Sequence, residues 1–135
     1  MEEKKFERPK RITLDDKQIF DEAVKTILSV LGSDAVKIIL YGSVARGDNT
    51  WESDVDIAVL TKREIDKETG HRLSMALWDL GMELDAFYSV ITIEVNHFNE
   101  WLFALPFYFN IDEEGIVLWT QDEERSFQST VLSAR

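Results

Sequence analysis

The chain has 135 residues, of which 44% are hydrophobic and 30% charged, and it contains no cysteine. This length matches one domain. The lack of cysteine excludes disulfides and thiolate metal sites, and it is compatible with a reducing cytosol. The net charge of −11 disfavours nucleic acid and anionic membranes as partners, and no apolar run reaches the ~20 residues that span a bilayer. We expect a cytoplasmic domain that binds a basic protein or multivalent cations.

The first half of the chain predicts one helix and two strands. Residues 1–12 are charged and are expected to form an arm, and Thr13-Leu-Asp-Asp16 is a capping box for a helix that ends at Gly32. Apolar runs predict strands over 36–41 and 54–61. The gap between these strands is too short for a normal crossover, so we expect them to be antiparallel.

The second half alternates helices and strands. We expect a helix over 64–80 that stops at Gly81, a strand over 84–93, helices over 96–105 and 107–114, and a strand over 116–119. The polar residues 121–135 are expected to form a tail or a short helix. The pattern predicts an α+β fold, with a small mixed sheet packed by helices, over residues 13–120.

Gly42 and Ser43 follow the first predicted strand directly. A glycine there allows a sharp turn and a close approach to a ligand, and the free N–H groups of a following helix start, with the Ser43 hydroxyl, can bind an anion. The alternative is an ordinary strand-to-helix turn in which Ser43 is the N-cap.

Asp54 and Asp56 open the second predicted strand. Residues two apart on a strand point to one face, with Cα atoms roughly 6.6 Å apart. The alternative is that Asp54 belongs to a turn and Asp56 to a solvated strand edge. Asp85, with Glu83 as runner-up, would start the third strand, and if that strand lies beside the second, three carboxylates meet. Oxygen ligands of this kind suit Mg²⁺, although Asp85 could equally be a helix-to-strand turn residue.

The combination of Gly42-Ser43, ten residues and Asp54-x-Asp56, within Leu-Tyr-Gly-Ser-Val-Ala-Arg-Gly, resembles the DNA polymerase β-type nucleotidyltransferase superfamily. The similarity is greatest to its minimal nucleotidyltransferase (MNT) branch. The downstream segment 105–119 also resembles the end of that branch.

This resemblance implies a polymerase β-like fold in which Gly42 and Ser43 hold the terminal phosphates of ATP. Asp54 and Asp56 would ligate Mg²⁺, as two ions, and Asp85 would complete the metal site and help deprotonate the acceptor hydroxyl. Arg46 would add a positive charge near the phosphates or simply be solvated at the surface. Free-standing MNT proteins are often antitoxins of HEPN-domain RNase toxins, and some transfer AMP to a toxin tyrosine.

Three functional hypotheses follow. The first is a Mg²⁺-dependent enzyme that transfers AMP from ATP to a protein hydroxyl. The second is an antitoxin that neutralises its partner by occlusion, for which the aromatic second half offers an association face. The third, a structural protein with a cation-stabilised turn, leaves the coincidence of the motif parts unexplained.

Overall fold

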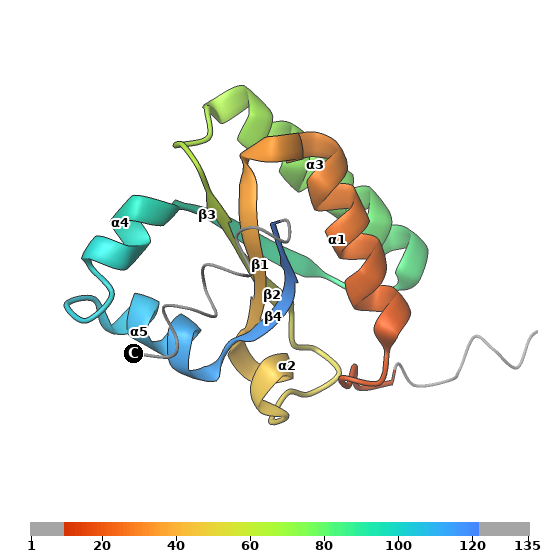
Figure 1. Cartoon of the computed structure of the whole chain (residues 1–135). Helices are drawn as coiled ribbons and strands as arrows, with labels where there is room; N and C mark the ends of the chain where they lie inside the picture. Colours follow the sequence, from red (N-terminus) through yellow and green to blue (C-terminus); the bar gives the residue numbers. More distant parts are fainter. Residues whose placement is uncertain (1–9, 122–135) are drawn as a thin grey trace, which may run out of the picture.

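The computed structural model describes residues 10–121, and its centre is a four-stranded sheet with the order β3-β2-β1-β4 (Figure 1). β1 (Ala35–Tyr41) is antiparallel to both β2 (Val55–Thr61) and β4 (Ile116–Thr120), and β3 (Tyr88–Glu94) runs parallel to β2. The predicted mixed sheet and antiparallel first pair are therefore confirmed. Most of the predicted arm (1–9) and tail (122–135) lies outside the described residues.

Helices cover both faces of the sheet. α1 (Lys17–Leu31) and α3 (Lys67–Leu84) pack together on one face, while α4 (Val95–Glu100) and α5 (Pro106–Glu114) cover the other (Figure 1). A short 3₁₀ turn, η2 (Gly32–Asp34), leads from α1 into β1, and α2 (Gly42–Arg46) leads out of it. Within residues 10–121, no helix combines the length and the apolarity that a membrane crossing requires.

The second strand is buried on both faces, and this orients its two acids. Val55, Ile57 and Val59 pack in the core under α1 and α3, whereas Ala58 and Leu60 pack under α4 and α5. Because side chains alternate along a strand, Asp54 and Asp56 belong to the same face as Ala58 and Leu60. The two carboxylates therefore lie on the α4–α5 face, at the end of the sheet where β2 begins.

The first helix begins three residues later than the capping box implies. The Asp16 carboxylate accepts a hydrogen bond from the Thr13 N–H at 2.7 Å, but Asp16 itself is the N-cap. The buried residues of α1 recur at the helical spacing that the sequence predicts: Phe20, Ala23, Ile27 and Leu31. Gly32 ends the helix, with a φ of 56°, as predicted.

The predicted stop at Gly81 and the predicted strand start at residue 84 are both wrong. Helix α3 continues to Leu84, and its C-cap is Asp85 in the left-handed region, with a φ of 60°. Gly81 lies inside the helix, and a glycine is needed there because the backbone of Ala86 folds back on it and leaves no space for a Cβ. The Ala86 N–H donates to the Gly81 carbonyl at 3.0 Å. Strand β3 consequently starts only at Tyr88.

The remaining elements differ from prediction mainly in their bounds. The helix expected over 96–105 is only the six-residue α4, followed by a turn over 101–104. Helix α5 has Pro106 in its first turn, where the missing N–H of proline costs no hydrogen bond. It ends at Gly115, as predicted, and β4 follows.

Candidate active site

The turn after β1 brings its glycine against an acid of β2. Tyr41, the last residue of β1, pairs with Asp56, and Gly42 follows with a φ of +80°. A Cβ on Gly42 would overlap the Oδ2 atom of Asp56, so any other residue would have to displace that carboxylate. Glycine is therefore required here both for its backbone angle and for the close approach.

Asp54 and Asp56 form a coupled pair at the start of β2. Asp54 is exposed and directly precedes the strand, while Asp56 is half-buried. Burial raises the pKa of Asp56, the negative charge of Asp54 raises it further, and Arg46 partly opposes both. The two predicted carboxylates are thus close enough to repel one another, and one of them is poorly solvated.

Tyr41 and Ser43 flank the glycine. Tyr41 is half-buried, and burial together with the charge of Asp56 raises the pKa of its phenol, which stays neutral at pH 7. Its ring meets that of Phe107 edge to face, with centroids 5.7 Å apart. Ser43 is the second residue of α2 rather than its N-cap, a position that Tyr41 occupies, so the N-cap alternative for Ser43 is wrong.

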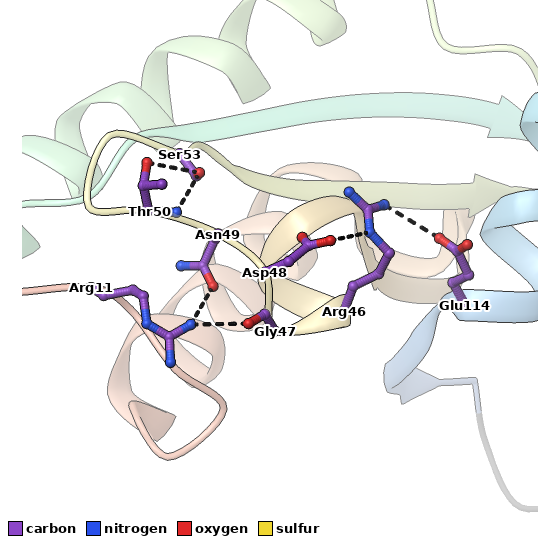
Figure 2. A network of polar contacts seen from close by, with 8 residues as sticks. All are labelled: Arg11, Arg46, Gly47, Asp48, Asn49, Thr50, Ser53 and Glu114. Carbon is purple, nitrogen blue, oxygen red and sulfur yellow. Dashed lines mark hydrogen bonds and ion pairs between the residues drawn. The ribbon is translucent and has the colours of Figure 1, made fainter.

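Arg46 lies at the end of α2 and forms two ion pairs. Its guanidinium contacts Asp48 at 3.2 Å and Glu114 of α5 at 3.3 Å, with 43% of its side chain exposed (Figure 2). Such exposed pairs contribute little to stability. Arg46 therefore links α2 to α5 while leaving its charge available near Asp56.

The loop between the turn and the acids is held by side-chain hydrogen bonds. Buried Asn49 donates to the Ile12 carbonyl and accepts from Arg11, each at 2.9 Å. Figure 2 shows the bond from Arg11 to Asn49 and a second one from Arg11 to the Gly47 carbonyl. Ser53 closes the loop by accepting from the Thr50 N–H at 2.9 Å. These bonds set the path from the glycine turn to Asp54.

The third predicted carboxylate is not part of this group. Asp85 is an exposed helix cap, and Glu83 is exposed in the last turn of α3. The residue of β3 that pairs with Asp56 is Ser89. Over residues 10–121, no three acidic, histidine or cysteine side chains come together as a metal site. The expected three-carboxylate cluster is therefore corrected to an aspartate pair, and Asp85 is the helix-to-strand turn residue of the alternative hypothesis.

The aspartate pair nevertheless suits a divalent cation. Two carboxylates share one face, one of them is desolvated, and their repulsion would be relieved by a positive ion between them. The ligand atoms are all oxygens, which is the donor set that Mg²⁺ prefers. Residues 54 and 56 thus fit the metal that the sequence predicts, without the third ligand.

Sequence reasoning missed the parts of the site that depend on distant residues. Arg11 and Asn49 hold the loop although 38 positions separate them, and Ser89 reaches Asp56 only through strand pairing. The motif-based predictions for Gly42, Ser43, Asp54 and Asp56 needed no such information. No local pattern in the sequence signals the Arg11–Asn49 contact.

Comparison with known proteins finds a family model over most of the chain. Residues 22–124 match the model described as "Polymerase beta, Nucleotidyltransferase". A candidate protein adenylyltransferase of Methanocaldococcus jannaschii, MJ0141, is 44% identical over 45 residues. That match spans 33% of this chain and 46% of the relative, less than half of its length.

Solved structures share the fold at low sequence identity. A mutant of the toxin–antitoxin MntA-HpeT aligns with a TM-score of 0.53 at 19% identity and covers 85% of both chains. The tri-AMPylated HEPN toxin of Shewanella oneidensis in complex with its MNT antitoxin has a TM-score of 0.51 at 18% identity, covering 82% of this chain and 77% of that one. A nucleotidyltransferase-like protein of Sulfolobus solfataricus has a TM-score of 0.52 at 16% identity, covering 78% and 83%. The fold is that of the polymerase β-like proteins, and by the extent of the family match the chain belongs to the polymerase beta nucleotidyltransferase family.

Proposed function

We propose that this protein is a Mg²⁺-dependent nucleotidyltransferase that transfers AMP from ATP to a hydroxyl of a partner protein. The observation that carries the proposal is the contact of Gly42 with Asp56, beside Asp54, in a chain of this family. The named relative MJ0141 supports a protein as acceptor.

In this proposal the two aspartates bind the metal, and three residues of the β1–α2 turn and of α2 bind the phosphates. Asp54 and Asp56 would hold Mg²⁺, which when bound supplies positive charge that stabilises the attacking and leaving oxygens. Gly42 admits the terminal phosphates close to the backbone, Ser43 offers its hydroxyl, and Arg46 offers a charge that can leave its surface ion pairs. Catalysis then depends chiefly on positioning the α-phosphate and the acceptor hydroxyl.

We further propose that the partner is a HEPN-domain toxin and that both act in the cytoplasm. The support is the fold shared with the antitoxin of the Shewanella oneidensis complex and with the MntA-HpeT pair. Modification of the toxin by AMP would then be the antitoxin activity. The net charge of −11 suits a basic, RNA-binding partner.

A second candidate function is neutralisation by occlusion, without transfer. The observation that favours it is the amount of apolar side chain left in water, including Trp78, Phe87 and Phe103, which are 54%, 58% and 84% exposed. An extended apolar surface of this kind can hold a partner by itself.

The test is incubation with α-labelled ATP, Mg²⁺ and the protein encoded next to this chain, which the proposal takes to be the HEPN-domain partner. Label on that protein, absent with Asp54→Asn and Asp56→Asn but present with the control Asp21→Asn, which changes an exposed acid of α1, would support transfer. Tight binding of an unlabelled partner by the wild-type protein would instead favour occlusion.

A further inference from the structure

The outer face of α3 carries a row of large apolar side chains. Met75, Trp78 and Met82 follow the spacing of one helix face and are 47%, 54% and 66% exposed. The opposite face of the same helix carries the buried residues Leu73 and Leu77. A helix with one apolar face in the core and a second one in water has a surface that another molecule can cover.

This row continues across the sheet edge toward the candidate active site. The rings of Trp78 and Phe87 lie 6.0 Å apart, and Phe87 precedes β3. Phe87 lines a hollow of about 220 Å³ together with Trp51, Ser53 and Asp85. Ser53 directly precedes Asp54, and the Phe87 carbonyl accepts from the Val55 N–H at 2.7 Å. We call the surface formed by Met75, Trp78, Met82, Phe87 and Trp51 the α3–β3 face.

The order of the strands relates this face to the direction of attack. The aspartates head β2, which has β1 and the Gly42 turn on one side and β3 on the other. In an in-line displacement at phosphorus, the attacking and leaving oxygens lie on opposite sides of the phosphorus atom. If pyrophosphate leaves toward Gly42, the acceptor hydroxyl arrives from the β3 side, where Trp51 and Phe87 of the α3–β3 face line the hollow beside Ser53.

A second exposed apolar surface lies on the opposite side. It includes Phe103, Phe107 and Phe109 in and before α5, which packs against α2 and β1. Phe107 also contacts Tyr41 at the end of β1. This surface adjoins the side on which the phosphates would bind, and an acceptor seated there would approach the leaving group rather than the opposite side of the phosphorus.

The charges around the α3–β3 face specify the partner further. Glu52 and Asp85 line the hollow together with Lys10, and α3 carries the exposed acids Asp79 and Glu83 next to Trp78 and Met82, with the exposed Arg72 one turn before Met75. Acids therefore outnumber basic residues at this face. Apolar side chains flanked by carboxylates complement a segment that combines apolar and basic residues.

We propose that the α3–β3 face docks the acceptor protein through an apolar, basic segment and so presents its hydroxyl in line with the α-phosphate. The covalent step is the one already proposed: the acceptor oxygen bonds to the α-phosphorus, the bond to the β-phosphate oxygen breaks, and the hydroxyl proton passes to solvent or a nearby carboxylate. This inference rests on the proposed function for the identity of the reaction, but binding can be measured without it.

The test uses two matched pairs of exposed aromatic rings. Trp78→Ala/Phe87→Ala removes the pair on the α3–β3 face, and Phe103→Ala/Phe109→Ala removes a pair with a similar ring separation, 6.1 Å, on the other surface. Both variants are measured in the full chain with the proposed partner, the protein encoded next to it, by titration calorimetry and by label transfer from α-labelled ATP. We expect the first variant to raise the Kd and the acceptor KM at least tenfold with the KM for ATP within twofold of wild type, and the second to change none of them beyond twofold.

Each other outcome has a distinct meaning. A wild-type protein that binds the partner but transfers no label defeats the proposed function and leaves the docking inference standing if the first variant still loses binding. Equal binding by the first variant and the wild type overturns the inference. A raised KM for ATP would assign the hollow to the nucleotide, and a wild-type dimer that Trp78→Ala/Phe87→Ala converts to monomer would assign the face to a second copy; either result overturns it too.

Discussion

Gly42 lies directly against the carboxylate of Asp56, across the antiparallel pair β1–β2. Gly42 contributes a left-handed backbone angle to this contact, and Asp56 contributes a half-buried carboxylate. Because the contact leaves no space for a Cβ, the turn and the acid must be tested together.

Gly42→Ala should therefore impair both stability and activity. A left-handed backbone costs an L-residue about 1–2 kcal/mol, and the new Cβ would also displace the Asp56 carboxylate. Gly47→Ala is the matched control, since Gly47 has a similar φ of +86° but its Cβ would meet no atom of the described residues within 4 Å. We expect both variants to lose unfolding free energy but only Gly42→Ala to lose most of its label transfer; equal transfer by the two variants would contradict the role of the contact.

Asp54→Asn and Asp56→Asn should each lower the rate of nucleotidyl transfer by about 100-fold or more, the typical effect of losing a key electrostatic group. Asp85→Asn should reduce it less than about tenfold, because Asp85 is a solvent-exposed helix cap outside the aspartate pair. Steady-state rates at saturating ATP and Mg²⁺ measure the difference. A loss with Asp85→Asn as large as with Asp56→Asn would restore Asp85 to the catalytic group.

Without metal, Asp56 should destabilise the fold at neutral pH. Its pKa is raised above the ordinary 3.8 by burial and by Asp54, so the folded state favours its protonated form. The contribution of Asp56 to the free energy of unfolding is therefore highest below the unfolded pKa, where the carboxyl is protonated in both states. It falls as the pH rises from the unfolded pKa through the raised folded pKa. Thermal unfolding in chelator should thus give Asp56→Asn a higher Tm than wild type at pH 7, with the difference shrinking as the pH falls and vanishing below the unfolded pKa.

Magnesium should reverse that order. An ion that binds only the folded aspartate pair stabilises it by mass action, so the wild-type Tm should rise with Mg²⁺ while that of Asp56→Asn stays constant. Potassium chloride at the same ionic strength serves as the control for general screening. A wild-type Tm that does not respond to Mg²⁺, with or without ATP, would count against the metal site.

Arg46→Ala should raise the KM for ATP about tenfold, the effect of losing one hydrogen bond to a charged group, with little change in Tm. Its ion pairs to Asp48 and Glu114 are exposed and contribute little to stability. Arg63→Ala, which removes the exposed ion pair to Asp34 at 3.1 Å, is the control and should leave the KM unchanged. Equal KM values for the two variants would show that Arg46 only links α2 to α5.

Local pattern was sufficient for most of the fold. The helical spacing of Phe20, Ala23 and Ile27 predicts α1 and its buried face, and the short gap between the first two strands predicts their antiparallel pairing. The pattern failed at the end of α3, where the apolar residues around Asp85 look like a strand start. The helix continues because the chain folds back on Gly81 and because the Tyr88 hydroxyl donates to the Ile19 carbonyl of α1 at 2.6 Å.

By itself, the sequence determined the candidate site residues: a glycine able to adopt a positive φ, and two acids that strand alternation places on one face. Only the tertiary structure decided which groups meet. It seats Gly42 against Asp56, pairs Asp56 with Ser89 rather than with a third carboxylate, and leaves the outer face of α3 in water. The physical reason is that alternation and helical spacing act within a few residues, whereas strand register and helix ends depend on contacts between distant parts of the chain.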